Sequence, residues 1–347
     1  MSDKTYRAAV IGLGMIGGAD QVSGDALGQK VSGMDGTHTY AYQNHPRIDL
    51  IAGSSRDPGR RERYETRTGA KTYADWQDMI AQESLDIVSV ATYTPVHAEI
   101  TIACAEAGIP VIYCEKPAAT TVPDAEHMLE ACQSRDALLV FNHQRRFRQD
   151  HRKLRKHILA DNLGELTSIS LQWATGRLSN VGSHVIDALF MLTGRRVQAV
   201  SATLDLTGRP DCRGPEFRDP GCWGVMRMDN DLMVTVNAPD NAQSPFRTEI
   251  NGSKGRAIVG ASTVTLETWN GQTETWSPDD KTPSSMDRAA DEIVAWLDNR
   301  TPFPYDPEEA VHTLEAIVAF HASHARNAAW TDLPLSGTDR DIVVLSG

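Results

Sequence analysis

The sequence has few of the features that mark secreted, membrane-spanning or disulfide-stabilised proteins. Its five cysteines are an odd number without a Cys-x-x-Cys pair, which favours reduced thiols and a cytoplasmic location. Residues 1–4 lead into a short strand pattern without an apolar signal core, and no uninterrupted apolar run approaches the length needed to span a bilayer. We therefore expect neither a signal peptide nor a membrane segment.

Basic charge and metal-ligand patterns are also missing. A net charge of −12 leaves no excess of cations to neutralise phosphates, which argues against nucleic-acid binding. The histidines show no metal-ligand spacing, so we expect no metal site. The 347 residues, 40% of them hydrophobic, are enough for two domains with ordinary cores.

Strand and helix patterns alternate through the first part of the chain. Apolar, β-rich runs lie at residues 6–11, 48–53, 85–91, 109–114 and 137–142. Helical patterns lie between them, at residues 59–68, 76–83, 98–107 and 123–134. This alternation predicts a doubly wound, mostly parallel sheet in a dinucleotide-binding domain of residues 1–147.

The pattern changes after about residue 150, where a helix at 150–160 precedes longer alternating runs. These runs lie at residues 165–173, 196–207, 222–228, 231–238, 246–251, 256–259 and 263–269. They are typical of antiparallel strands with one solvated face, and helices at 285–299 and 307–326 follow them. We predict an α+β domain of residues 148–347 with a large, open, mostly antiparallel sheet for substrate binding and oligomerisation. An open sheet usually buries its outer face, so we expect an oligomer.

A glycine-rich turn, Gly12-Leu13-Gly14-Met15-Ile16-Gly17, follows the first predicted strand. Between a strand and a helix, such glycines let the backbone approach a pyrophosphate. We therefore expect Gly12, Gly14, Met15 and Ile16 to bind a dinucleotide cofactor.

The helix that should follow this turn is delayed. A polar, glycine-rich stretch runs to Gly36, and helical periodicity resumes only at Thr37. Residues 18–36 therefore look like an insertion beside the cofactor phosphates. An ordinary surface loop, a lid, and a contact with substrate or a neighbouring subunit all fit this pattern.

The end of the second predicted strand, Ser54-Ser55-Arg56-Asp57, addresses the choice of cofactor. Enzymes that use NAD usually have an acidic residue at this position, where it binds the ribose diol. Here Ser55 takes the position of the acid and Arg56 follows it, a pair that suits a 2′-phosphate and favours NADP. A shift of the turn would bring Asp57 to the ribose instead and favour NAD.

Further polar residues follow predicted strands at the edge where doubly wound folds bind ligands. Thr92 and Pro95 are expected to line the cofactor on its nicotinamide side. His97, also at this cofactor edge, starts the next helix and is expected to cap or pack rather than catalyse. After the last strand of the domain, His143 and Arg146 are the basic residues expected to hold a polar substrate.

The segment Val111–Pro117 ends an apolar strand with Glu-Lys-Pro at the same edge. Pro117 lacks a backbone donor and limits Lys116 to extended geometry, so the strand stops there. This placement indicates a lysine aimed at the reacting carbon beside a nicotinamide.

Together these segments resemble the Gfo/Idh/MocA oxidoreductase family over nearly the whole chain. The resemblance rests on the glycine turn, Ala-Thr-x-x-Pro-x-His at 91–97, Glu-Lys-Pro at 115–117 and Arg-Arg-Phe at 145–147, in that order. In the second domain, Asn-x-Gly-x-His-x-x-Asp at 180–187 is similar to a helix start of the family, and 249–255 to its late hairpin.

The resemblance implies an NAD- or NADP-dependent dehydrogenase or reductase that acts on CH–OH groups. Lys116 would hydrogen-bond the reacting oxygen, His184 would be the general acid/base, and Glu115 would help to fix the cofactor ribose region. Asp187 would orient His184 or bind substrate hydroxyls. The family also implies homodimers or homotetramers.

Asn180 departs from the family, which often has aspartate there to complete a Lys-Asp-His set. An asparagine side chain can hold a substrate hydroxyl, but it cannot take a proton or a negative charge. The proton transfer would then depend on His184, with the oxygen stabilised by Lys116.

Three functions remain open at this level. The first is interconversion of a secondary alcohol and a ketone on a sugar, cyclitol or related polyol. The second is cleavage of a glycoside through transient oxidation at C3, with no net change in nicotinamide absorbance. The third is a regulator that binds a dinucleotide without catalysis.

Overall fold

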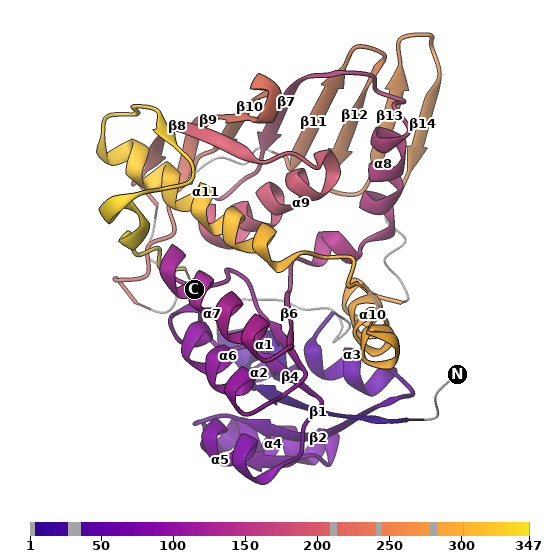
Figure 1. Cartoon of the computed structure of the whole chain (residues 1–347), viewed down its shortest axis with the longest axis vertical. Helices are drawn as coiled ribbons and strands as arrows, with labels where there is room; N and C mark the ends of the chain where they lie inside the picture. The colour runs from indigo at the N-terminus through magenta and orange to yellow at the C-terminus, as the bar shows by residue number, and fades with distance from the viewer. Residues whose placement is uncertain are drawn as a thin grey trace. The chain divides into compact units, whose positions relative to one another are not determined.

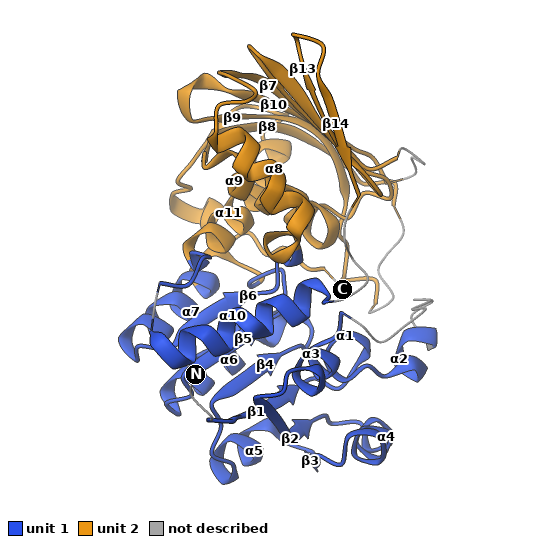
Figure 2. Ribbon diagram, turned by 90° about the vertical axis from the view of Figure 1, so that its right-hand side faces the viewer, with its two compact units in different colours: residues 1–119, 124–144, 280–307 blue, residues 120–123, 145–279, 308–347 orange. Residues whose placement is uncertain are grey.

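The computed structural model describes residues 4–26, 36–208, 214–240, 245–277, 283–300 and 302–346. The chain forms two compact units, which are described separately (Figure 2). Unit 1 comprises residues 1–119, 124–144 and 280–307, and unit 2 comprises residues 120–123, 145–279 and 308–347. A late segment of the chain thus returns to the first unit.

Unit 1 contains a six-stranded sheet in the order β3-β2-β1-β4-β5-β6, and every neighbouring pair of strands is parallel. This is the doubly wound order, in which the direction of winding reverses between β1 and β4. The strands are β1 (Tyr6–Ile11), β2 (Ile48–Ser54), β3 (Lys71–Tyr73), β4 (Ile87–Val90), β5 (Val111–Cys114) and β6 (Leu138–Phe141). The predicted parallel sheet is confirmed, and β3 adds a short edge strand.

Helices surround this sheet, with the long helix α10 beside α3 (Figure 1). They are α1 (Met15–Gly18), α2 (Gln21–Ala26), α3 (His38–Asn44), α4 (Pro58–Thr68), α5 (Trp76–Gln82), α6 (His97–Glu106), α7 (Val122–Ser134, which begins in unit 2) and α10 (Ser285–Asn299). Local chemistry fixes the ends of α4. The Asp57 carboxylate accepts the Arg60 N–H at its start, and Gly69 ends it with a φ of 73°.

The predicted insertion at residues 18–36 interrupts the helix after the glycine turn. α1 ends at Gly18, α2 is short, and α3 starts only after the Thr37 cap. Residues 27–35 of this segment lie outside the described part of the chain.

Unit 2 contains a nine-stranded sheet in the order β14-β13-β12-β11-β7-β10-β9-β8-β15. All its neighbouring strands are antiparallel except β7 and β10, as expected for a mostly antiparallel sheet. The strands are β7 (Leu166–Gln172), β8 (Val197–Asp205), β9 (Gly221–Met228), β10 (Met233–Ala238), β11 (Arg247–Gly252), β12 (Gly255–Gly260), β13 (Val264–Thr268), β14 (Thr273–Trp276) and β15 (Thr331–Asp332).

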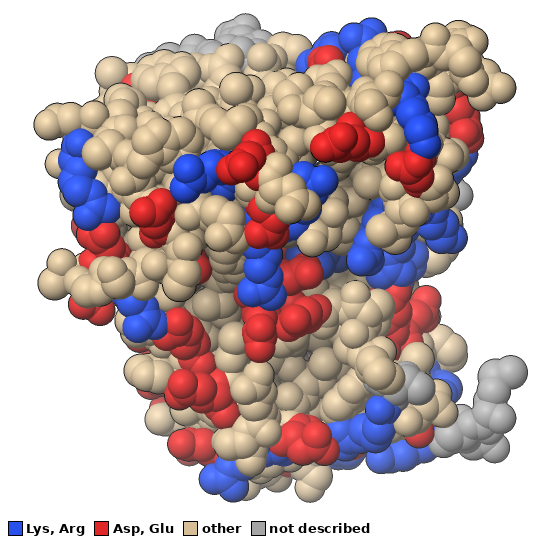
Figure 3. Space-filling view, turned by 45° about the horizontal axis from the view of Figure 1, so that its top comes forward, with Lys and Arg blue, Asp and Glu red and all other residues tan. Residues whose placement is uncertain are grey.

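Three helices, α8 (Gln149–Leu159), α9 (Ser183–Thr193) and α11 (Pro307–Ala325, whose first residue belongs to unit 1), lie on one face of this sheet (Figure 2). Buried side chains run along almost all of α9 and along most of α11, so these helices form the core of the unit. On the face drawn in Figure 3, acidic and basic side chains are interspersed. Within the described ranges, no helix is long and apolar enough to cross a membrane.

Candidate active site

The register of the parallel sheet brings five strand ends to one edge. Ile11 pairs with Ser54 on one side and with Val90 on the other, and the same row continues through Cys114 to Phe141. The residues that follow these positions therefore leave the sheet at one edge. They include Gly12, Ser55, Thr92, Glu115 and Asn142, four of which the sequence predicted as cofactor residues.

The glycines of the turn differ in how much space a side chain would have at each position. Gly12 has a φ of +99°, and a Cβ there would lie 2.4 Å from the Ala91 carbonyl oxygen. A Cβ at Gly17 would lie 2.0 Å from the Gly12 carbonyl oxygen, whereas one at Gly14 would meet nothing within 4 Å. Gly12 and Gly17 thus permit the turn, and Gly14 leaves its outer side open for a pyrophosphate.

Thr92 supplies a further test of whether the edge suits a cofactor. Its hydroxyl oxygen is buried and has no hydrogen-bond partner among the described residues. A buried hydroxyl without a partner is unfavourable, so a ligand that bonds to it would be stabilised there. Pro95 is exposed nearby in the chain, in the turn Thr94–Val96.

His97 is buried at the start of α6 and joins two loops at this edge. Its Nδ1 lies 3.0 Å from the Pro117 carbonyl oxygen and its Nε2 lies 3.2 Å from the Thr92 carbonyl oxygen. Burial lowers the pKa of His97, although these carbonyls favour the protonated ring. The contacts are those of a packing histidine, and its predicted place in the cofactor site stays a prediction.

At the end of β2, the Asp57 carboxylate is held by a hydrogen bond, whereas the Arg56 side chain is exposed. Asp57 Oδ1 accepts the Arg60 N–H at 3.0 Å, and this bond lowers the pKa of the Asp57 carboxyl. Arg61 donates to the carbonyl oxygens of Ser55 and Arg56, at 2.7 Å and 3.1 Å. The Arg56 side chain is exposed, and no hydrogen bond or ion pair of its guanidinium is present within the described ranges.

Lys116 lies between two anchored neighbours. The Glu115 N–H donates to the Val90 carbonyl at 2.8 Å, and the Lys116 N–H donates to Glu115 Oε2 at 3.3 Å. The peptide bond between Lys116 and Pro117 is cis, and Pro117 is the residue whose carbonyl His97 contacts. The Lys116 side chain is partly exposed, whereas both flanking residues are buried.

Glu115 is a buried carboxylate held in its charged form. Burial alone would raise its pKa, but hydrogen bonds from His38 and Asn142, with the charges of His38 and Lys116, hold the pKa of Glu115 at about 2. His38 was missed by the sequence reasoning, because only its position after the insertion distinguished it from an ordinary helix-start histidine.

In unit 2, His184 is the second residue of α9 and follows a π-helical turn, Leu178–Gly182. Asp219 fixes this turn, because its two carboxylate oxygens accept the N–H groups of Ser179 and Asn180 at 2.6 Å and 2.7 Å. Turns of this type occur often at functional sites. No sequence pattern indicated Asp219, which lies in a loop about forty residues further along the chain.

Arg146 and Asp187 lie together in unit 2. The guanidinium of Arg146 donates to both oxygens of Asp187 at 2.8–2.9 Å, and Glu309 lies 2.5 Å from the same group. Asp187 is fully buried. The pair therefore holds α9 one turn after His184, and the predicted substrate contacts of both residues stay predictions. In unit 1, His143 is buried, with Nδ1 3.2 Å from the Tyr305 hydroxyl.

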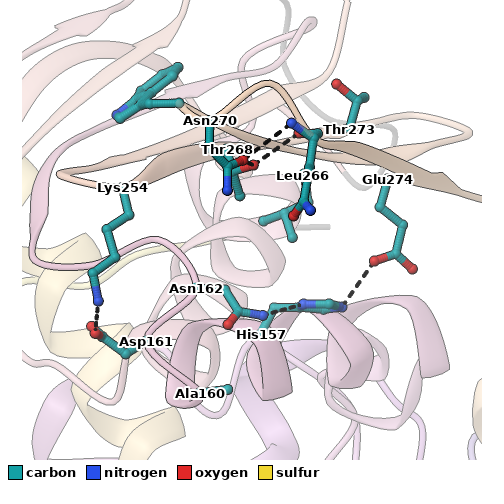
Figure 4. Close-up of a pocket in the computed structure, with 12 residues that line it drawn as sticks. His157, Ala160, Asp161, Asn162, Lys254, Leu266, Thr268, Asn270, Thr273 and Glu274 are labelled. Carbon is teal, nitrogen blue, oxygen red and sulfur yellow. Dashed lines mark hydrogen bonds and ion pairs between the residues drawn. The ribbon is translucent and has the colours of Figure 1, made fainter.

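A separate hollow of about 710 Å³ lies in unit 2 between the end of α8 and the β13–β14 hairpin (Figure 4). None of the predicted site residues lines it. Four of its polar side chains contact one another in pairs: Lys254 with Asp161, and His157 with Glu274. Among the described residues, no three His, Cys, Asp or Glu side chains are grouped to hold a metal ion.

The doubly wound sheet and its glycine turn have the form of a dinucleotide-binding domain. Residues 6–143 match the sequence model "Oxidoreductase family, NAD-binding Rossmann fold", and residues 170–258 match "GFO/IDH/MocA C-terminal domain". The chain belongs to the Gfo/Idh/MocA oxidoreductase family, as its sequence pattern predicted.

The chain is similar in sequence to dehydrogenases that act on cyclitols or sugars by name. The chain is 26% identical to an inositol 2-dehydrogenase of Corynebacterium glutamicum over 276 residues, which cover 74% of each chain. It is 28% identical to a levoglucosan dehydrogenase of Pseudarthrobacter phenanthrenivorans over 200 residues, 49% of this chain and 50% of the relative.

Solved structures share the fold across both units. A levoglucosan dehydrogenase in complex with NADH and levoglucosan aligns with a TM-score of 0.80 at 20% identity, over 96% of this chain and all of the other. The WlbA dehydrogenase of Bordetella pertussis, in complex with NADH and UDP-GlcNAcA, aligns with a TM-score of 0.76 at 20% identity, over 97% of this chain and all of the other.

Proposed function

We propose that the protein interconverts a secondary alcohol and a ketone on a sugar, cyclitol or related polyol. One observation carries the proposal: Lys116 leaves the ligand edge of the doubly wound sheet between two buried, hydrogen-bonded neighbours. Relatives named as inositol and levoglucosan dehydrogenases support the substrate class.

The residues have complementary roles in this proposal. The Lys116 ammonium stabilises negative charge as it develops on the substrate oxygen. The His184 imidazole takes the hydroxyl proton during oxidation and returns it during reduction. Asn180 holds a substrate hydroxyl, because its side-chain amide can donate and accept hydrogen bonds. This amide takes no part in proton transfer at neutral pH. A nicotinamide dinucleotide held at the glycine turn and at Thr92 would take up or supply the hydride.

We also propose NADP as the preferred cofactor, on the basis of Arg56. The Arg56 side chain is exposed just after β2, where we expect the ribose to lie, whereas the neighbouring Asp57 carboxylate caps α4. The glycine turn and the buried Thr92 hydroxyl suit either dinucleotide, so the preference depends on the end of β2.

The open face of the nine-stranded sheet suggests an oligomer. Trp223 and Met233 are 45% and 38% exposed on neighbouring strands, β9 and β10. A second copy of the chain would cover such a face, so we expect a homodimer or homotetramer. The four described cysteines are free and buried, in keeping with a reducing, cytoplasmic compartment.

The proposed activity is tested with a panel of polyols and keto-sugars, each assayed with NAD and NADP. Stoichiometric change in nicotinamide absorbance with at least one substrate is the expected result. Cleavage of a glycoside without net absorbance change, or cofactor binding without any turnover, would refute it.

A further inference from the structure

Six buried polar side chains form a hydrogen-bonded chain inside unit 1. They come from helix α3 and from β4, β5 and β6 or the residues that follow those strands, and all are nearly inaccessible to solvent. The members are Tyr42, Ser89, His38, Glu115, Asn142 and Tyr113. Because Glu115 directly precedes Lys116, this chain ends at the proposed catalytic residue.

One arm of the chain runs from α3 to Glu115. The Tyr42 hydroxyl and Ser89 Oγ are 2.5 Å apart, and Ser89 Oγ lies 2.7 Å from His38 Nδ1. On the other side of the ring, His38 Nε2 lies 3.0 Å from Glu115 Oε1. His38 therefore connects the two hydroxyls to the carboxylate.

The other arm reaches Glu115 from the last strand. Asn142 Nδ2 donates to Glu115 Oε1 at 2.6 Å, and the Tyr113 hydroxyl donates to Asn142 Oδ1 at 2.7 Å. The His38 and Tyr113 rings also pack edge to face, with centroids 4.6 Å apart.

The charge of Glu115 sets the direction of the bond between His38 and the carboxylate. An ionised carboxylate only accepts, so His38 Nε2 must donate to it. Nδ1 accepts the Ser89 hydroxyl when the ring is neutral and donates to Ser89 Oγ when the ring is protonated. In both cases the ring is hydrogen-bonded through both of its nitrogens, and the buried carboxylate keeps its partners.

The interrupted helix brings His38 to this position. The Thr39 hydroxyl donates to the Gly17 carbonyl oxygen at 2.7 Å, which joins the start of α3 to the end of α1. The residue next to His38 is thus bonded to the glycine turn, while His38 itself is bonded to Glu115. The same few residues therefore link the cofactor turn to the Glu-Lys-Pro segment.

We propose that His38 is a positioning residue for Lys116, which it holds through the Glu115 carboxylate. The other oxygen of that carboxylate accepts the Lys116 N–H, so a fixed Glu115 fixes the backbone from which the catalytic ammonium projects. This inference rests on the proposed function, because it gives His38 a purpose in the reaction that Lys116 performs. It assigns His38 no contact with substrate.

The test compares three variants of the full-length protein. His38→Leu removes both ring nitrogens, and His38→Gln keeps a side-chain N–H able to reach Glu115. His45→Leu is the matched control, because His45 lies at the other end of α3 and is not a member of the buried chain. Its Nδ1 accepts the Arg47 N–H, and its Nε2 forms an ion pair with Asp291 of α10. For each variant we would measure kcat, KM, the cofactor dissociation constant, Tm, and hydrogen exchange of the Lys116 amide.

His38→Leu should lower kcat by up to about 10²-fold, the effect of a displaced catalytic group, with KM and cofactor affinity little changed. His38→Gln should restore most of kcat, and His45→Leu should retain it. The Lys116 amide should exchange faster in His38→Leu than in His45→Leu. Unchanged kcat and unchanged exchange in His38→Leu, or a kcat loss that His45→Leu shares, would overturn the proposal.

The exchange measurement separates this inference from the proposed function. If the wild-type protein turned over no polyol or keto-sugar, the proposed function would fail. Faster exchange at Lys116 in His38→Leu alone would still support positioning by His38, and unchanged exchange would refute it.

Discussion

Arg56 offers a direct test of cofactor choice. Arg56→Ala removes an exposed guanidinium with no partner of its own among the described residues, so little stability should be lost. A charge-assisted hydrogen bond to a 2′-phosphate contributes about 1.5–3 kcal/mol. The variant should therefore bind NADP roughly 10- to 150-fold more weakly, and NAD with nearly unchanged affinity.

The assay is titration of each cofactor by calorimetry or fluorescence at two salt concentrations. Because the site is exposed, the loss should be smaller at high salt. Arg135→Ala is the matched control, since it removes one exposed cation after α7, at the opposite end of the sheet strands. Equal weakening of NAD and NADP by Arg56→Ala would refute the 2′-phosphate reasoning, as would a preference for NAD in the wild-type protein.

Three other predictions concern stability and binding. Gly12→Ala should lower Tm and abolish dinucleotide binding, because its Cβ would lie 2.4 Å from the Ala91 carbonyl oxygen. Gly14→Ala should weaken dinucleotide binding at unchanged Tm. A lower Tm in Gly14→Ala with an unchanged Tm in Gly12→Ala would contradict these roles. Asp187→Asn should lower the free energy of unfolding in urea by roughly 3–5 kcal/mol, because it leaves the buried Arg146 incompletely paired; a loss under about 1 kcal/mol would argue against that pairing. Because the pKa of Glu115 is lowered, its ionised carboxylate stabilises the folded state at pH values above the ordinary pKa of 4.5. This contribution, about 3 kcal/mol, should vanish as the pH falls from 4.5 towards 2. Acid unfolding of Glu115→Gln should depend less on pH over that window, and equal slopes for variant and wild type would show that Glu115 is not the group responsible.

Local sequence pattern was enough to predict the parallel sheet and the strand ends that share one edge of it. Strands such as Val111–Cys114 are continuous apolar runs, which is typical of parallel strands buried on both faces. Helix α4 is bounded by Asp57, Pro58 and Gly69, residues with strong positional preferences. Such signals involve neighbours in the chain, so they can be read without the fold.

Pairings between distant residues could not be predicted in this way. His38 and Glu115 are 77 positions apart, and Arg146 and Asp187 are 41 apart, so no periodicity connects them. The sequence placed Arg146 and Asp187 as separate substrate contacts, whereas the structure has them bonded to each other. Strand β14 was also missed, because Thr273–Trp276 is short, polar and mostly exposed.

In the proposed reaction, Lys116 stabilises the charge that develops on the substrate oxygen. Lys116→Met keeps the length of the side chain and removes its ammonium. Its rate of hydride transfer, measured in a single turnover with bound cofactor, should fall by about 10²–10³-fold, the loss seen when one charge-stabilising donor is removed. The cofactor dissociation constant should not change. A hydride-transfer rate equal to that of the wild-type protein would show that the Lys116 ammonium does not stabilise this charge.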